Sequence, residues 1–370
     1  MAHGRRTRIL IVDDSAVVRS LLRTVISADP SLEVAGTAAD GAAALEAVES
    51  VRPDLVLLDI EMPHLDGLET LRRLRSRGFT TPVIMVSAVT LRGARVTIEA
   101  LASGASDYVT KPAGHSDRET ALRVLAQDIL PRIQALTVSN AAPAAGSAYL
   151  AERTDLPRNP STAPSIVVIG VSTGGPAALD TLLSAIPPGF SLPILIVQHM
   201  PELFTGPLAE RLNQHCSLCV REAVEGAPVV PGAISIARGN WHMEVVAAAA
   251  AGCPPALHLH QGPLENHCRP AVDVLFQSAA AVFGASTLGI VLTGMGSDGL
   301  TGCRVIRARG GMILAQDRAT SAVWGMPGAV TQAGLAQRVL PLSAIAPEIL
   351  RLAVHSRGER CSPRELAVRP

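Results

Sequence analysis

The apolar positions of this chain fall into short aliphatic runs separated by longer amphipathic stretches. In the first 112 residues, runs of Val, Ile and Leu predict buried strands at 8–12, 34–37, 54–58, 82–86 and 107–110. Helical periodicity predicts helices at about 16–26, 42–49 and 91–103, the last ending before Gly104. Strands that alternate with helices predict a parallel, doubly wound α/β sheet.

The same alternation returns in the second half of the chain. Apolar runs predict strands at 166–170, 192–197 and 286–292, with helices at about 177–186 and 302–308. The first run leads into Gly170-Val-Ser172-Thr-Gly174, and Pro176 suits the first turn of a helix. The G-x-S-x-G pattern is typical of a sharp strand-to-helix turn that exposes a nucleophilic serine. A phosphate-binding loop or a plain βα turn fits the glycines as well.

A stretch rich in Ala, Pro and Ser separates the two halves. Residues 128–164 lack a steady apolar period, which favours a flexible linker; a packed helix is the alternative, opposed by the prolines beyond residue 157. We therefore predict domains at 1–127 and 165–355, with this linker between them. Residues 356–370 form a polar tail.

Composition narrows the class of protein. Hydrophobic residues make up 48% of the chain and aromatic ones 2%, so the cores are aliphatic. The 32 basic residues balance 32 acidic ones, so we expect no nucleic-acid partner, and no apolar stretch is long enough for insertion into a membrane. Six scattered cysteines predict reduced thiols and a cytoplasmic location.

Two cysteine-containing patterns raise the question of a metal. Cys216-Ser-Leu-Cys219 is a single C-x-x-C with no second pair, which makes a metal or redox role the weaker reading. A second set contains three histidines and one cysteine, at spacings outside the standard structural-zinc patterns, and a solvated strand and loop is favoured there. Its members are His258, His260, His267 and Cys268.

Polar residues stand at the carboxyl ends of four predicted strands in the first half. They are Asp13, Asp14, Asp59, Ser87 and Lys111. In open parallel sheets such ends meet at one edge and bind ligands. Clustered carboxylates need a cation, and oxygen ligands favour Mg²⁺. A carboxylate nucleophile can accept a phosphoryl group whose oxygens the metal and lysine neutralise. Ordinary surface acids and a solvated lysine are the alternative.

Longer motifs around these residues resemble a bacterial two-component receiver domain, which has a flavodoxin-like sheet of five parallel strands. The motifs are Ile11-Val-Asp-Asp-Ser15, Leu57-Leu-Asp-Ile-Glu-Met-Pro-His-Leu-Asp-Gly67, Val86-Ser-Ala88 and Tyr108-Val-Thr-Lys-Pro112. The resemblance implies phosphorylation of Asp59. It implies Mg²⁺ held by Asp14, Asp59 and the backbone carbonyl of Glu61, with Asp13 nearby. It also implies that Ser87 and Tyr108 rearrange on phosphorylation, with Lys111 beside them.

Three chemically matched side chains follow strands in the second half. Ser172, His199 and Asp298 each come just after an apolar run, so one sheet edge would bring them together. The histidine would take the serine proton and the aspartate would orient the imidazole. Taken singly, a structural histidine and an aspartate at a helix N-cap are ordinary. The chain order Ser, His, Asp differs from that of the α/β-hydrolases, chymotrypsin and subtilisin.

This order and its context resemble the catalytic domain of the CheB family, the chemotaxis protein-glutamate methylesterases. Matching stretches are Gly170-Val-Ser-Thr-Gly-Gly-Pro176, Val197-Gln-His-Met-Pro201, Arg269-Pro-Ala-Val-Asp-Val-Leu-Phe276, Leu292-Thr-Gly-Met-Gly-Ser-Asp-Gly299, Ala315-Gln-Asp317 and Gly325-Met-Pro327. The resemblance implies an α/β/α domain with a mainly parallel sheet. It implies Ser172 as nucleophile, His199 as general base, Asp298 as its partner and an oxyanion hole of the Thr173 and Met295 N–H groups. Arg238 departs from the family pattern, which usually has proline there, and leaves the substrate rim or receiver contact open.

Together the two resemblances imply an enzyme of sensory adaptation in chemotaxis. Phosphorylation by a histidine kinase would activate hydrolysis of glutamate γ-methyl esters on chemoreceptors, and deamidation of receptor glutamines is expected too. Mg²⁺ would serve the receiver, and ester hydrolysis would need no cofactor. A phosphorylation-controlled binding module and a serine hydrolase of broader scope are the alternatives, because function resides in the site rather than the fold.

Overall fold

The computed structural model describes residues 5–112, 117–138, 163–248 and 250–358. Predictions for residues 139–162 of the linker and for most of the polar tail fall outside these ranges. Across the described ranges, every helix is either too short or too polar to span a bilayer.

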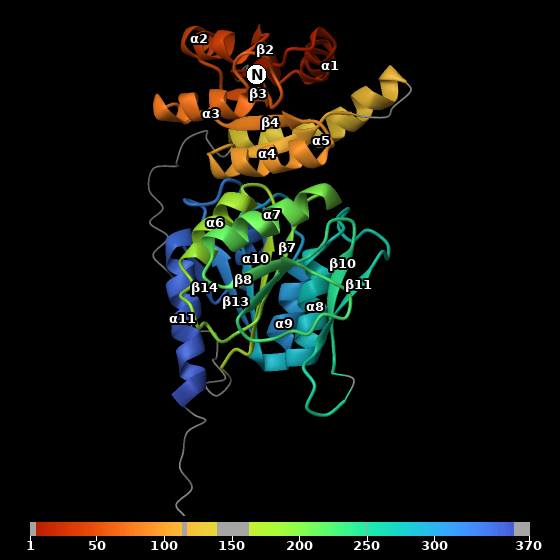
Figure 1. Ribbon diagram of the computed structural model, residues 1–370, viewed down its shortest axis with the longest axis vertical. Coiled ribbons are helices and arrows are strands. Elements are labelled where there is room, and N and C mark those ends of the chain that lie inside the picture. Colours follow the sequence, from red (N-terminus) through yellow and green to blue (C-terminus); the bar gives the residue numbers. More distant parts are fainter. Residues whose placement is uncertain (1–4, 113–116, 139–162, 249, 359–370) are drawn as a thin grey trace, which may run out of the picture.

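The first domain is a five-stranded sheet in the order β2-β1-β3-β4-β5, with every neighbouring pair parallel. Its helices cover both faces of the sheet, which confirms the predicted doubly wound receiver fold (Figure 1). The elements are β1 (Thr7–Val12), α1 (Ala16–Ser27), β2 (Leu32–Ala38), α2 (Gly41–Val51), β3 (Leu55–Asp59), α3 (Gly67–Ser76), β4 (Val83–Ser87), α4 (Leu91–Ala102), β5 (Asp107–Thr110) and α5 (Arg118–Val138).

Local signals fix where four of these helices begin. Each starts after a residue whose side-chain oxygen accepts a hydrogen bond from the backbone N–H three positions later, which satisfies one free donor of the first turn. These N-cap residues are Ser15, Asp40, Asp66 and Thr90.

The helix α5 corrects the predicted start of the linker. Its helical backbone runs to Val138, so residues 128–138 belong to the receiver rather than to a flexible tether. Ile129, Ile133 and Leu136 are buried in the receiver core. Their spacing of four and three residues is a helical period, which the Ala- and Pro-rich composition farther along obscured in the sequence.

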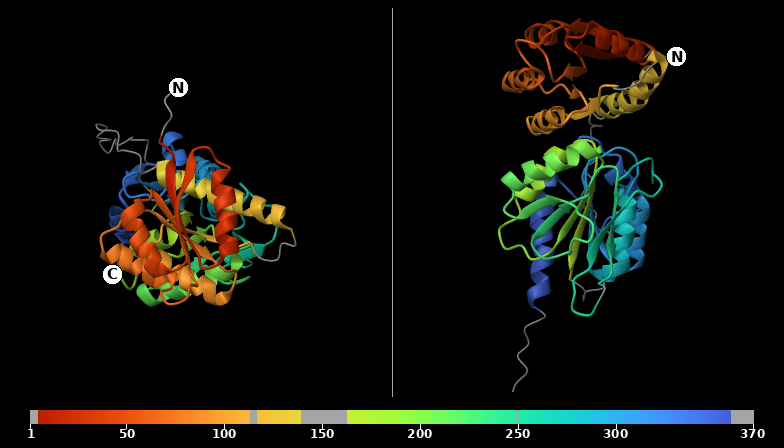
Figure 2. Two further views of the ribbon diagram at one scale, coloured as in Figure 1. Left: turned by 90° about the horizontal axis from the view of Figure 1, so that it is seen from above. Right: turned by 45° about the vertical axis from the view of Figure 1, so that its right-hand side comes forward.

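The second domain is built on a seven-stranded sheet in the order β14-β13-β12-β6-β7-β9-β8, again with every pair parallel. Helices lie on both faces (Figure 2), which confirms the predicted α/β fold, and β10 and β11 form a separate antiparallel pair. The elements are β6 (Ile166–Val171), α6 (Gly175–Ser184), β7 (Ile194–Gln198), α7 (Glu202–His215), β8 (Cys219–Glu222), β9 (Ala233–Ile236), β10 (His242–Val246), β11 (Ala256–His260), α8 (Val272–Phe283), the 3₁₀ turn η1 (Gly284–Ser286), β12 (Thr287–Val291), α9 (Leu300–Ala308), β13 (Met312–Gln316), α10 (Met326–Gln332), β14 (Arg338–Leu340) and α11 (Leu342–Gly358).

The two domains pack directly on each other. Helix α4 of the receiver lies across α6 and α7 of the second domain (Figures 1 and 2). The Tyr108 ring stacks on Phe204 of α7 with 4.8 Å between ring centroids. At the rim of the same contact, Arg95 forms an exposed ion pair with Glu210, 3.1 Å apart. The receiver therefore covers the second domain near the carboxyl ends of β6 and β7.

Candidate active site

Ser172 and His199 stand side by side because their strands are neighbours. In the parallel pair β6–β7, Val171 lies opposite Gln198, and each candidate residue is the next one in its chain. The backbone N–H of His199 donates to the carbonyl of Val171 at 3.1 Å, which extends the ladder by one step. The structure thus places both residues at one edge of the sheet, as the sequence predicted.

A tight turn presents Ser172 at this edge. Its N–H donates to the carbonyl of Thr293 at 3.0 Å, and the Gln198 amide donates to its carbonyl at 3.0 Å. Gly174 closes the turn with φ of +76°, and a Cβ there would lie only 2.5 Å from the Cβ of Ala322. Within the described ranges the Ser172 hydroxyl makes no hydrogen bond, so its predicted bond to His199 is absent from this conformation.

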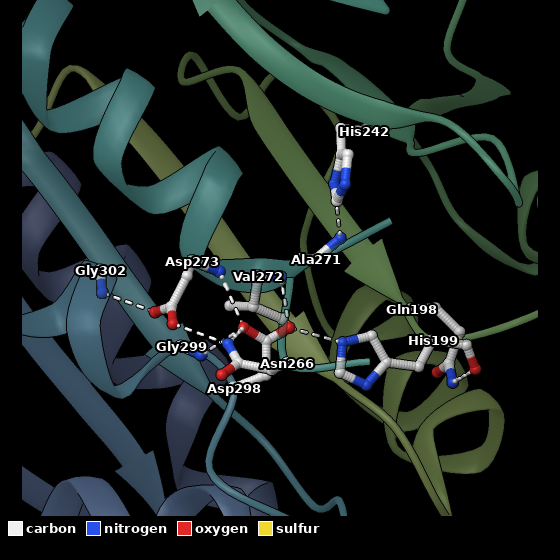
Figure 3. Close-up of polar contacts among 10 residues, drawn as sticks. All are labelled: Gln198, His199, His242, Asn266, Ala271, Val272, Asp273, Asp298, Gly299 and Gly302. Atoms are coloured by element: carbon white, nitrogen blue, oxygen red, sulfur yellow. Dashed lines mark hydrogen bonds and ion pairs between the residues drawn. The ribbon is translucent and has the colours of Figure 1, made fainter. Parts of the chain in front are cut away.

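The other half of the predicted triad is formed. His199 Nε2 and Asp298 Oδ2 lie 2.8 Å apart, and the carboxylate accepts four further hydrogen bonds (Figure 3). Those four donors are Val272 N (2.6 Å), Asp273 N (3.1 Å), Gly299 N (2.9 Å) and Asn266 Nδ2 (2.9 Å). The five donors fix the orientation of the Asp298 carboxylate, which directs one oxygen at the imidazole.

Asp298 also joins two helices. It accepts the first two N–H groups of α8, while Asp273 of α8 accepts the Gly302 N–H in the first turn of α9, at 2.6 Å (Figure 3). The alternative to a catalytic role for Asp298 was an ordinary N-cap of the helix that follows it. Instead, Asp298 caps α8, and Gly299 stands at the N-cap of α9. His242 supports the same corner by accepting the Ala271 N–H at 3.3 Å.

His199 and Asp298 each shift the pKa of the other toward its charged form. Burial is the largest single effect on the pKa of His199 and would lower it, but the hydrogen bonds and charges of Asp298 and Cys268 together outweigh burial and raise that pKa to about 9. Burial would raise the pKa of Asp298, but the His199 hydrogen bond and charge hold it below its usual range. The arrangement therefore favours an imidazolium–carboxylate pair, which is the state produced when His199 takes a proton.

Backbone donors lie next to Ser172. In the described part of the chain, the N–H groups of Thr173 and Met295 have no acceptor. The loop that carries Met295 passes close by: a Cβ built on Gly294 would lie 2.8 Å from the Cβ of Ser172. Unpaired N–H groups beside a nucleophile are the kind that stabilise an oxyanion, and the assignment of these two remains a prediction.

The receiver carries the second predicted cluster. Carboxylate oxygens of Asp13, Asp14 and Asp59 lie within 4.8 Å of one another. Lys111 Nζ is 3.0 Å from Asp13 and 2.8 Å from Asp59. Burial raises the pKa of Asp59 to about 6; the Lys111 hydrogen bond opposes this and the charge of Asp13 adds to it.

This donor set fits Mg²⁺. The buried Oδ2 atoms of Asp13 and Asp59 have no hydrogen bond besides their ion pairs with Lys111, so carboxylate charge is left to neutralise. Hard oxygen ligands suit this ion. Asp14, Asp59 and the carbonyl of Glu61 are the predicted ligands, and the bound ion would neutralise phosphoryl oxygens on Asp59.

The predicted switch residues occupy the path from this cluster to the second domain. Ser87 is fully buried; its hydroxyl donates to the Ala88 carbonyl at 3.2 Å and accepts from Thr97 at 2.9 Å. Tyr108 is the residue that stacks on Phe204. The switch pair thus has one member inside the receiver and one in the domain contact.

Sequence reasoning missed a polar link between the domains. Asp107 of β5 is buried and accepts the Thr173 hydroxyl at 2.8 Å. Arg132 of α5 lies 3.2 Å from the same carboxylate oxygen and also pairs with Asp128. Asp107 had no signal in the sequence, because its role depends on how the two domains dock.

Other residues singled out in the sequence lie around the site. Arg238, the departure from the family pattern, pairs with Glu202 at the start of α7 and lies over the Trp241 ring at 5.8 Å. It lines a cavity of about 560 Å³ together with Leu91 and Arg95 of α4, which places it at the receiver contact.

The four residues considered for zinc separate in the structure. His258 and His260 lie on β11 and face Glu225 and Glu244, at 3.1 and 3.7 Å. Cys268 instead lies beside His199 and Asp298. Cys216 and Cys219, like every cysteine in the described ranges, are free thiols.

Comparison with known proteins identifies both domains. The family model for CheB methylesterase matches residues 167–349, and the model for the response regulator receiver domain matches residues 9–123. A protein-glutamate methylesterase/protein-glutamine glutaminase of Nocardioides sp. is 49% identical over 95% of this chain and 96% of its own. A protein of the same description from Trichodesmium erythraeum is 47% identical over 93% of this chain and 98% of its own.

A solved structure matches the second domain. The catalytic domain of Thermotoga maritima CheB methylesterase is 39% identical, with a TM-score of 0.50, and the match covers 52% of this chain and 100% of that one. With two domain models and relatives that span almost its whole length, the chain belongs to the CheB methylesterase family, as a hydrolase domain joined to a response regulator receiver.

Proposed function

We propose that this protein hydrolyses glutamate γ-methyl esters on chemoreceptors under control of phosphorylation. The observation that carries the proposal is the His199–Asp298 pair, 2.8 Å apart, at the strand end beside the half-buried turn of Ser172. The names of its relatives, protein-glutamate methylesterase/protein-glutamine glutaminase, supply the substrate class. A chemotaxis histidine kinase would be the phosphodonor.

The chemistry follows from the three side chains. Ser172 Oγ attacks the ester carbonyl while His199 takes its proton, and the N–H groups of Thr173 and Met295 hold the oxyanion. His199 then protonates the leaving methanol, and a water molecule hydrolyses the acyl-enzyme to free carboxylate. Because Asp298 favours the imidazolium, it stabilises the charge that each proton transfer creates. The Ser172 side chain must first turn toward His199.

A glutamine side chain can follow the same route. Its amide carbonyl would form the same acyl-enzyme, with ammonia as the leaving group, and hydrolysis would leave glutamate. We therefore propose glutaminase activity at the same site, in line with the second half of the relatives' names.

The contact between the receiver and the second domain would control access to the active site. A cavity of about 500 Å³ leads to His199, and Val89 of the receiver lines it together with residues of the second domain. Phosphorylation of Asp59 would draw Ser87 toward the phosphoryl group and shift Tyr108 away from Phe204. Loss of that stack would favour conformations with an open site.

Methanol release from a methylated receptor tests the function and its control together. We expect a small phosphodonor with Mg²⁺ to raise turnover of the full chain by on the order of 5- to 150-fold, the usual range of coupling between sites. Asp59→Asn should keep the basal rate and lose the stimulation. Equal stimulation of Asp59→Asn would contradict the assignment of Asp59, and absence of methanol in every sample would contradict the methylesterase proposal and leave the binding module and the hydrolase of broader scope as alternatives.

The link from Asp107 to Thr173 gives a second test of control. Asp107→Ala removes the hydrogen bond and the Arg132 ion pair, so we expect unphosphorylated protein to release methanol several times faster, within the same 5- to 150-fold range. Arg95→Ala is the matched control, because an exposed pair across the same contact contributes only about 0.2–1 kcal/mol. An unchanged basal rate in folded Asp107→Ala would show that this link does not restrain the enzyme.

A further inference from the structure

A thiol stands beside the catalytic pair and has no part in the proposed chemistry. Ligand atoms of Cys268, His199 and Asp298 lie within 4.8 Å of one another. Cys268 and His199 are partly exposed and line the cavity of about 500 Å³, and His199 Nε2 lies 2.8 Å from the buried Asp298 carboxylate. A small ion entering this cavity therefore meets one sulfur, one nitrogen and one oxygen donor.

These donors differ in kind from those of the receiver cluster. The receiver offers carboxylates alone, which suit Mg²⁺. Thiolate and imidazole are the ligands of Zn²⁺ and similar transition ions, and three protein ligands with an open fourth position are common in accessible zinc sites. The identity of the ligands thus predicts which ion binds where.

The hydrogen bonds around Asp298 leave one of its oxygens, Oδ2, able to bind such an ion. Oδ1 accepts three donors, but Oδ2 accepts only the Val272 N–H besides His199. An ion that takes the place of the proton between His199 Nε2 and Asp298 Oδ2 keeps every other bond of the carboxylate. Cys268 then supplies the third ligand.

Among the described residues that line this cavity, the basic side chain is Arg269, which follows Cys268. Its guanidinium donates to the Gly262 carbonyl and to Asn240 Oδ1, each at 2.7 Å. Its charge is therefore engaged by acceptors other than the three proposed ligands.

We propose that Cys268, His199 and Asp298 form a zinc site through which Zn²⁺ reversibly inhibits the enzyme. Binding releases the proton of the thiol and the proton shared by the imidazole and carboxylate. The ion then occupies the nitrogen that Asp298 orients, so His199 can no longer serve as general base. The inhibition rests on the proposed function, whereas the binding site itself does not.

Binding is tested apart from activity, with Co²⁺ as a spectroscopic probe of the full-length Ser172→Ala protein. We expect one equivalent of Co²⁺ to produce a thiolate-to-cobalt charge-transfer band that Zn²⁺ removes. Cys268→Ser in the same background should lose the band. Replacing Cys216 and Cys219 together by serine is the matched control, since it removes the other closely spaced thiols and should leave the band intact. A band that survives Cys268→Ser, or no band in the parent, would overturn the site.

Inhibition is tested by methanol release from the otherwise native chain. We expect Zn²⁺ to inhibit it and a chelator to restore it. Half-inhibition of Cys268→Ser, relative to its own rate without zinc, should need at least about 10- to 100-fold more Zn²⁺, because loss of a partner that only supports a ligand already costs that much metal affinity. Equal sensitivity of the two proteins would refute the inhibitory role. A cobalt band without any esterase activity in the native chain would instead refute the proposed function and leave the zinc site standing.

Discussion

Ser172→Ala is expected to lower methanol release from methylated receptor by on the order of 10⁴-fold or more, the loss typical when a serine nucleophile is removed. The fold should be unaffected, because the Ser172 hydroxyl makes no hydrogen bond in the described structure. Single-turnover release of methanol, followed with the melting temperature of each protein, separates lost chemistry from lost folding.

Ser184→Ala is the matched control for this prediction. Ser184 is an exposed residue at the end of α6, the helix that begins three residues after Ser172, and its hydroxyl donates only to the Thr181 carbonyl at 3.2 Å. It should retain the full rate. Substantial methanol release by Ser172→Ala would remove Ser172 from the role of nucleophile, whatever the family resemblance implies.

Asp298→Asn is expected to lower kcat by about 10³- to 10⁴-fold and to destabilise the fold as well. In serine hydrolases the exchange of this carboxylate for an amide leaves the imidazole in the wrong tautomer, at a cost of about 10⁴-fold. Here five donors converge on the two oxygens, so an amide must point its NH₂ group at other N–H groups in either orientation. An unmatched buried donor costs about 1–3 kcal/mol.

A surface pair elsewhere in the domain supplies the control. Asp180 on α6 and His215 on α7 also form an Asp–His contact, 3.0 Å apart, but both side chains are partly exposed to solvent. Asp180→Asn should leave kcat and the unfolding midpoint in urea close to those of the parent protein. If Asp298→Asn changed neither quantity more than Asp180→Asn does, the coupling of this carboxylate to catalysis and folding would be disproved.

Much of the fold could be predicted because it depends on local pattern. Apolar runs that alternate with amphipathic segments specify parallel sheets, and in such sheets the residue after each strand lies at a shared edge. This is why Ser172 and His199 could be brought together without coordinates. Composition alone groups residues 128–138 with the linker segment 139–162, whereas their apolar face is helical and packs into the receiver core.

The surroundings of the site could not be predicted in the same way. Asn266 and Asp273 reach Asp298 from a loop and from the start of a helix, and their sequence gives no sign of a shared partner. Asp107 contacts Thr173 only because the receiver docks on this face. Such contacts depend on how elements far apart in the chain are placed, which short-range periodicity does not specify.

Ser172 and Asp298 differ in what their presence in a related protein indicates about its activity. Asp298 accepts the first two N–H groups of α8 and that of Gly299, the N-cap of α9, so a descendant that had lost its chemistry would still be selected to keep the carboxylate. The Ser172 hydroxyl makes no hydrogen bond within the described residues, so only selection for catalysis would preserve it. Among degenerate copies of this enzyme, the serine is therefore the first position to drift, and its identity is the better sign of whether a copy still works.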